Sequence, residues 1–265
     1  MGNEKKLIIT VTTANSWIYP EVKNWPETVN DLIETVIQCH NAGAAIAHIH
    51  LIKGKEKEIV NTIREQCDII IQAGMSSDPI EDRKALFDAR PDMVSIILNH
   101  HDERFTNVEL HRLHPREELE KYCKICNEYK IKPEWEVWHH GSIWNLNYLI
   151  EKKLIKGPHF LSVFFNWPGG AWSPPEPGEY LHRIKYFPQD SLHTVSIMGS
   201  EQVKIATLAI SMGGHIRVGT EDYPFIKEGI SAKDNAEIVK NWVIISEKMG
   251  RSVANASEVR NMIDI

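Results

Sequence analysis

Short runs of β-branched and other apolar residues alternate along the chain with longer segments whose apolar residues recur at helical spacing. The run KLIITVTT at residues 6–13 predicts a first strand, and residues 14–25 carry no regular pattern. In residues 26–42 the apolar positions have helical spacing, which predicts a helix. Pro26 suits the first turn of that helix, and Gly43 suits its end.

The same alternation continues to the C-terminal end, interrupted by a polar segment at residues 99–104 for which no element is predicted. Further strands are expected at residues 44–51, 68–73, 92–97, 133–138, 159–164, 193–197 and 215–218. Further helices are expected at residues 56–66, 79–89, 115–129, 142–152, 177–186, 201–212 and 232–249. Hydrophobic strands separated by helices are typical of an α/β protein with a parallel sheet covered on both faces.

Eight such strand–helix units in 265 residues favour a closed (β/α)8 TIM barrel over an open sheet. No Gly-x-Gly-x-x-Gly follows the first strand, which argues against a dinucleotide-binding fold. Because no linker or low-complexity segment divides the chain, we expect residues 1–265 to form a single domain.

Composition narrows the class of protein further. The chain is 42% hydrophobic and 25% charged, as globular domains are, and its net charge of −6 without a Lys/Arg-rich run argues against nucleic acid as a partner. No signal-like segment opens the chain, and no apolar run approaches the roughly 18 residues that span a bilayer. Of the four cysteines, only Cys123 and Cys126 have metal or redox spacing, and they lie in a predicted helix. We interpret the cysteines as reduced thiols of a cytoplasmic protein.

Two histidines stand at the end of the second predicted strand. Residues two apart in a strand point to the same face, so His48 and His50 project together, roughly 7 Å apart at the backbone. Two hydrogen-bonded core histidines are the alternative, and each histidine alone would favour it. For the pair at the end of a buried strand, we favour a site for one divalent metal ion.

A third ligand is expected from the end of the eighth strand. In a barrel, functional residues lie at the C-terminal strand ends, which selects Arg217, Glu221 and Asp222. The second and eighth strands both neighbour the first, so Glu221 can complete a site of two histidines and one carboxylate. This set fits zinc, and other divalent transition metals also suit it. The alternative for Glu221 and Asp222 is an acidic cap on the following loop.

Four motifs, standing in order, resemble those of the β-keto acid cleavage enzyme family, whose founding activity is 3-keto-5-aminohexanoate cleavage. They are His48-x-His50 after Ala42-Gly43-Ala44, Pro133-Glu134-x-Glu136-Val137, Pro168-Gly169-Gly170, and Gly214-His215-Ile216-Arg217-Val218-Gly219-x-Glu221-Asp222. The resemblance implies a zinc-dependent (β/α)8 barrel, usually a homotetramer. It also implies the reaction, in which a β-keto acid and acetyl-CoA give acetoacetate and a new CoA thioester.

By this resemblance His48, His50 and Glu221 are the zinc ligands, while Arg217 and Asp222 match the catalytic arginine and aspartate. Zinc can hold the keto acid and polarise its carbonyl group. Asp222 can remove a proton from the bound substrate, and Arg217 offers a fixed fork for a carboxylate or thioester oxygen. The alternative for Arg217 is a structural ion pair with Asp222 or Glu136.

The loops that should face the substrate depart from the family pattern. After the first strand, Ala14-Asn15-Ser16-Trp17 lacks the glutamate that reads the substrate's amino group. Gly74-Met75-Ser76-Ser77 and Leu98-Asn99-His100-His101 also differ from the usual turns. The 3-keto-5-aminohexanoate specificity therefore does not transfer. The expected substrate contacts are Asn15, Trp17, Ser76, Asn99, His100, Glu136, Gly169 and Gly170.

Five tryptophans fall in segments expected at the catalytic rim, Trp17, Trp25, Trp138, Trp167 and Trp172. One interpretation is that they pack the rim or a subunit interface. The second is that they form the wall of a substrate pocket. In the second case an apolar or aromatic acyl chain is favoured, because the first loop lacks the carboxylate that a cation would use. Two other functions stay open on the same scaffold: a metal-dependent lyase, aldolase or hydrolase without acetyl-CoA, and a barrel that binds metal and ligand without turnover.

Overall fold

Eight parallel strands close into a barrel in the computed structural model, which describes residues 6–105 and 108–265. Each strand is hydrogen-bonded to its two neighbours around the barrel. In spatial order the strands are β1 (Ile9–Thr12), β10 (His215–Gly219), β9 (Ser191–Ile197), β8 (His159–Phe165), β7 (Lys132–Val137), β4 (Met93–Ile97), β3 (Ile70–Ala73) and β2 (Ile46–Ile49). The predicted (β/α)8 barrel is confirmed.

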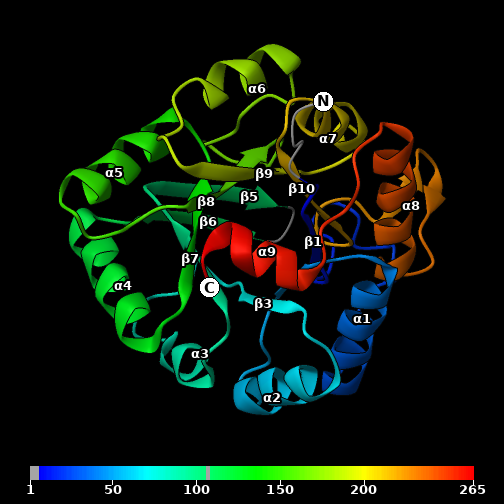
Figure 1. Cartoon of the computed structure of the whole chain (residues 1–265), viewed down its shortest axis with the longest axis horizontal. Helices are drawn as coiled ribbons and strands as arrows, with labels where there is room; N and C mark the ends of the chain where they lie inside the picture. Colours follow the sequence, from blue (N-terminus) through cyan, green and yellow to red (C-terminus); the bar gives the residue numbers. More distant parts are fainter. Residues whose placement is uncertain (1–5, 106–107) are drawn as a thin grey trace.

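Helices surround this barrel (Figure 1). They are α1 (Val29–Ala42), α2 (Glu56–Gln66), α3 (Lys84–Ala89), α4 (Arg116–Tyr129), α5 (His140–Glu151), α6 (Pro177–Ile184), α7 (Gln202–Ser211) and α8 (Asn235–Lys248). The first begins three residues after Pro26, because the Thr28 hydroxyl accepts from the Asp31 amide and forms a capping box there. It ends at Gly43, whose φ of 115° is a left-handed value that glycine adopts readily.

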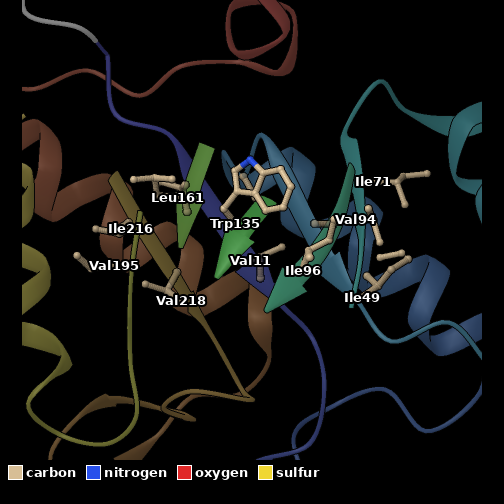
Figure 2. Packing of buried hydrophobic residues seen from close by; sticks show 14 of the residues in the cluster. Val11, Ile49, Ile71, Val94, Ile96, Trp135, Leu161, Val195, Ile216 and Val218 are labelled. Atoms are coloured by element: carbon tan, nitrogen blue, oxygen red, sulfur yellow. The ribbon is translucent and has the colours of Figure 1, made fainter. Parts of the chain in front are cut away.

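The strand pleat divides side chains between two buried environments. Apolar residues of the outer faces pack against the helices, and Figure 2 shows Val11, Val94, Trp135, Leu161 and Val218 in this layer. The residues between them point inward, because successive side chains of a strand alternate. Many of these are polar and buried: Thr10, Thr12, His48, Gln72, Ser95, Glu134, Glu136, Ser162, Thr194, Ser196 and Arg217. The barrel therefore has an apolar exterior layer and a polar interior.

Two hairpins and a last helix lie outside the predicted pattern. The polar segment after β4 forms an antiparallel hairpin of β5 (His100–Phe105) and β6 (Val108–Leu113), and β10 is followed by a small hairpin of β11 (Phe225–Lys227) and β12 (Ile230–Ser231). A last helix, α9 (Ala256–Ile263), lies across the N-terminal strand ends (Figure 1). Its buried face packs on residues that open the strands, including Ile8, Ile46 and Phe160. This end is therefore an apolar floor, which leaves the opposite end for chemistry.

No helix within the described residues has both the length and the apolar character needed to cross a membrane.

Candidate active site

The nitrogen and oxygen atoms of His48, His50 and Glu221 converge inside the C-terminal end of the barrel. One ligand atom from each lies within 4.8 Å of the others. The Nε2 atoms of His48 and His50 lie 3.8 Å and 3.6 Å from the Glu221 carboxylate oxygens, which is too long for hydrogen bonds. Two ligands of a tetrahedral zinc ion, each about 2.1 Å from the metal, stand roughly 3.4 Å apart. The spacing of the three side chains therefore fits a shared metal ion.

Neighbouring residues prepare the imidazole of His48 for this role. Its Nδ1 lies 3.0 Å from the Gln72 amide oxygen on β3, so the ring proton sits on Nδ1 and the Nε2 lone pair faces the site. Burial, together with the nearby charge of Arg217, lowers the pKa of His48 to about 3. A neutral ring is the form that binds a metal.

A glycine after β3 makes room for both rings. A Cβ atom on Gly74 would lie 2.6 Å from Cδ2 of His50 and 2.8 Å from Nε2 of His48, closer than such contacts occur. Gly74 is itself held in place, since its carbonyl accepts a hydrogen bond of 3.1 Å from the buried Arg83 guanidinium.

Glu221 is held by two groups on its Oε2 atom. The Arg217 Nη2 donates to it at 2.8 Å, and the Thr12 hydroxyl donates to the same oxygen. This leaves Oε1 on the side of His50. Burial raises the pKa of Glu221, but the charge of Arg217, together with the neighbouring histidines and the Thr12 hydrogen bond, outweighs it and holds the pKa at about 2. The carboxylate is therefore ionised, as a metal ligand must be.

Asp222 lies deeper and shares the same arginine. Its Oδ1 accepts from Arg217 Nη2 at 2.9 Å, and its Oδ2 accepts from the Ser196 hydroxyl at 3.1 Å. The side chain is fully buried, and this burial raises the pKa of Asp222 to about 7, even though Arg217 acts in the other direction. A carboxyl group with a pKa near neutrality can both accept and return a proton.

A cavity of about 130 Å³ opens beside these groups. The three metal-ligand candidates and Arg217 line it. Among the tryptophans, Trp17, Trp138 and Trp167 contribute to its wall, together with Phe164, whose ring stacks on Trp138 at a centroid distance of 4.5 Å. Trp25 is outside this lining, and Trp172 is half exposed.

The structure separates the other expected substrate contacts into two groups. Ser76 and Glu136 line the cavity and are joined by a hydrogen bond of 2.8 Å from the Ser76 hydroxyl to the carboxylate. Asn15 is half-buried, and neither it nor Asn99 contributes to the cavity lining. The Asn99 carbonyl instead accepts the backbone N–H of His114 at 2.9 Å, at the base of the hairpin.

His100, Gly169 and Gly170 likewise lie outside the cavity lining, because all three belong to or contact the face of the β5–β6 hairpin that points away from the cavity. The pleat of β5 turns His101 toward the cavity and His100 to the other face. The two glycines allow close contact with that other face, since a Cβ on Gly169 would lie 1.6 Å from the Asp102 carbonyl oxygen and one on Gly170 2.2 Å from its carboxylate. They position the hairpin.

Several residues of the site were not found from sequence. Gln72 orients His48, Thr12 and Ser196 hold the two carboxylates, and His101 and Glu103 line the cavity. A polar residue within an otherwise apolar strand, as Gln72 is in DIIIQA, is the signal that would have selected it. Identifying His101 and Glu103 from the sequence would have required knowledge of the hairpin register.

Fold and site together define a (β/α)8-barrel protein with a cluster of two histidines and a glutamate that could hold a divalent metal beside a buried arginine–aspartate pair. A model of the beta-keto acid cleavage enzyme family matches residues 6–265. The chain belongs to this family and is an enzyme that acts on β-keto acids.

Relatives with assigned names agree with this membership. The 3-keto-5-aminohexanoate cleavage enzyme of Acetoanaerobium sticklandii is 31% identical over 279 residues, which cover 98% of this chain and 99% of that protein. The 3,5-dioxohexanoate:acetyl-CoA acetone transferase of Paraburkholderia graminis is 22% identical and covers 100% of this chain and 97% of its own. A ternary complex of ObcA with a C4-CoA adduct and oxalate has a TM-score of 0.73 at 15% identity, over 91% of this chain and 68% of that one, and shares the fold.

We predict that replacing His48 or His50 by Ala removes bound zinc while the barrel stays folded, because the ligands project from a scaffold built by other contacts. Zinc content measured by mass spectrometry should fall from about one per chain to a small fraction of that in both variants. His111→Ala, on the exposed face of the hairpin, is the matched control and should keep the metal. Full occupancy in both variants would contradict the ligand assignment.

We also predict that Gln72→Leu lowers zinc affinity by roughly 10- to 100-fold, because His48 loses the acceptor that fixes its ring. Competition with a chromophoric chelator measures the affinity, and circular dichroism monitors the fold. Gln38→Leu on the exposed side of α1 serves as control. An affinity equal to that of the parent would show that Gln72 does not orient the ligand.

Proposed function

We propose that this enzyme transfers the acyl group of a β-keto acid to CoA, converting the keto acid and acetyl-CoA into acetoacetate and a new acyl-CoA. The observation that carries the proposal is the cluster of His48, His50 and Glu221, joined to Asp222 through one arginine at the wall of a small cavity. Relatives whose names specify β-keto acid cleavage or acetyl-CoA transfer support it.

The metal in this proposal is zinc, held by His48, His50 and Glu221. When bound, zinc would supply Lewis-acid polarisation of the substrate carbonyl. The fit rests on the donor set, the tautomer that Gln72 imposes on His48, and the space that Gly74 leaves.

Arg217 binds and orients the anionic part of the substrate. Its guanidinium lines the cavity and stays charged, because the charges of Asp222 and Glu221 raise its pKa against the effect of burial. Phe164 and Trp167 flank it, with ring centroids 5.6 Å and 5.8 Å from its Cζ atom, and keep the group in a low-dielectric setting. Charge-assisted hydrogen bonds are strong in such a setting.

Asp222 is the proton acceptor. It lies one hydrogen bond behind the cavity wall, because the Arg217 nitrogen that binds Glu221 also binds Asp222. Ser196 holds its second oxygen, and Trp167 in turn donates to Ser196 at 3.3 Å. These contacts fix the carboxylate in one orientation and exclude water from it, so that a proton taken from the substrate stays at Asp222 for return to the product.

Homotetramer assembly and a cytoplasmic location stay predictions of the family resemblance and of the composition.

We expect the purified enzyme to consume at least one β-keto acid from a panel of apolar, ammonium-bearing and carboxylate-bearing compounds only when acetyl-CoA is present. Formation of acetoacetate and of the new thioester, measured by liquid chromatography and mass spectrometry, checks this. Consumption that proceeds equally without acetyl-CoA would instead identify a lyase or hydrolase. Binding of the acids without any turnover would identify a non-catalytic barrel.

We expect Asp222→Asn to lower kcat by roughly 10²- to 10⁴-fold with zinc content unchanged, since the amide keeps the shape but cannot take a proton. A rise in KM with kcat kept within a few-fold would show that Asp222 only positions Arg217. Asp88→Asn on the outer helix α3 is the control and should match the parent.

A further inference from the structure

The cavity ends at a wall that lies opposite the metal-ligand cluster. His48 comes from β2 and Glu221 follows β10, and both of these strands neighbour β1. Strand β7 stands four places from β1 in either direction around the barrel, diametrically across from it. Glu136 and Trp138, from β7 and the residue after it, therefore face the metal cluster across the cavity.

The hairpin after β4 adds a second carboxylate to this wall. His101 and Glu103 on β5 and Leu110 on β6 line the cavity, and Glu103 stands directly opposite Leu110 in the hairpin register. Asp102 belongs to the other face, where it pairs with His111 at 3.2 Å. Because side chains alternate between the two faces of a strand, Glu103 points toward the cavity.

The hairpin is fastened on both sides, which fixes the position of Glu103. The Arg104 N–H donates to the Pro168 carbonyl at 3.1 Å, in the loop after β8. The Arg112 guanidinium donates to the Ser77 carbonyl at 2.7 Å, in the loop after β3, and also pairs with Glu118 at 3.1 Å. A carboxylate on a strand held by hydrogen bonds has a better defined position than one on a free loop, and so discriminates better between substrates.

The charges on this wall are unbalanced. Glu103 is 14% exposed, and its ion-pair partner among the described residues is Nε2 of His101 at 3.1 Å. Glu136 receives hydrogen bonds from Ser76 and from the indole N–H of Trp138, both at 2.8 Å and both neutral donors. The partly buried Glu103 and the fully buried Glu136, whose pKa burial raises to about 7, thus share one imidazole. Negative charge in such a site is costly unless a cation joins it.

The aromatic rings beside these carboxylates also suit a cation. Trp138 lies 4.7 Å from the ring of His101, and Trp17 lines the same cavity. Indole faces attract ammonium groups through their quadrupole, most strongly when water is excluded.

We propose that Glu103 is a specificity-determining residue that selects β-keto acids with a positively charged, hydrogen-bond-donating group, an ammonium, at the end distant from the carboxylate. This inference rests on the proposed function, which places the acid end of the substrate at Arg217 and the metal ligands. It reverses the expectation of an apolar chain. That expectation relied on a missing acid after β1, whereas the acid here comes from the hairpin after β4.

The test compares two β-keto acids of equal length, one ending in an ammonium and the other in a methyl group, with the zinc-loaded enzyme and acetyl-CoA. The parent should prefer the ammonium compound by roughly 10- to 100-fold in kcat/KM, the range expected for a charge-assisted hydrogen bond. Glu103→Gln should abolish this preference by raising KM for the ammonium compound alone. Glu109→Gln on the opposite face of the hairpin is the matched control and should keep the preference.

A parent that prefers the methyl compound, or a Glu103→Gln variant that weakens both substrates equally, would overturn the proposal. If neither acid is consumed, calorimetric binding of the same two acids to the zinc-loaded protein decides the inference by itself. The proposed function fails only if the whole panel, carboxylate-bearing acids included, is left unconsumed. Tighter binding of the ammonium acid that Glu103→Gln removes would support it. Equal binding by the two acids would refute it.

Discussion

The ion pairs of Arg217 with Glu221 and Asp222 set the charge state of the whole site. One nitrogen, Nη2, binds both carboxylates at 2.8 Å and 2.9 Å inside the barrel. Without the guanidinium, two buried carboxylates would face each other uncompensated, a strongly destabilising arrangement. The pairing keeps Glu221 ionised for a metal while Asp222 retains a pKa near 7. The absence of a side chain at Gly219 lets β10 lie close to β1 at this point, because a Cβ there would lie 2.0 Å from the Thr12 carbonyl oxygen.

The pleat of the strands places the residues that stabilise the fold on the outer face of the barrel and the residues of the candidate site on its inner face. Outward residues such as Val11 and Leu161 bury apolar area against the helices and supply the main driving force for folding. Inward residues of the same strands are free to be polar, and α9 closes the floor below them. A polar interior is tolerated where its side chains bind one another, as Ser95 does in donating to Glu134 at 2.5 Å.

The sequence was sufficient to predict the barrel and the meeting of His48, His50 and Glu221, since both follow from local rules. Apolar periodicity identifies the strands, and closure makes the second and eighth strands neighbours of the first. The metal identity and the catalytic roles of Arg217 and Asp222 stay predictions. The β5–β6 hairpin could not be found, because residues 100–104 are polar on both faces of β5 and the apolar alternation in β6 is too short to predict a strand. That omission selected His100 in place of His101 and concealed Glu103, since a shift of one residue along a strand exchanges its faces.

The central claim is that the acetyl group of acetyl-CoA and the acyl group of the keto acid exchange partners. Acetyl-CoA labelled with ¹³C at both acetyl carbons tests it most directly in one turnover experiment followed by NMR. We expect the label to appear at C3 and C4 of acetoacetate, while the unlabelled acyl group of the keto acid appears as a CoA thioester. Label that stays in acetyl-CoA while the keto acid is consumed, or acetoacetate that carries none, would contradict this exchange.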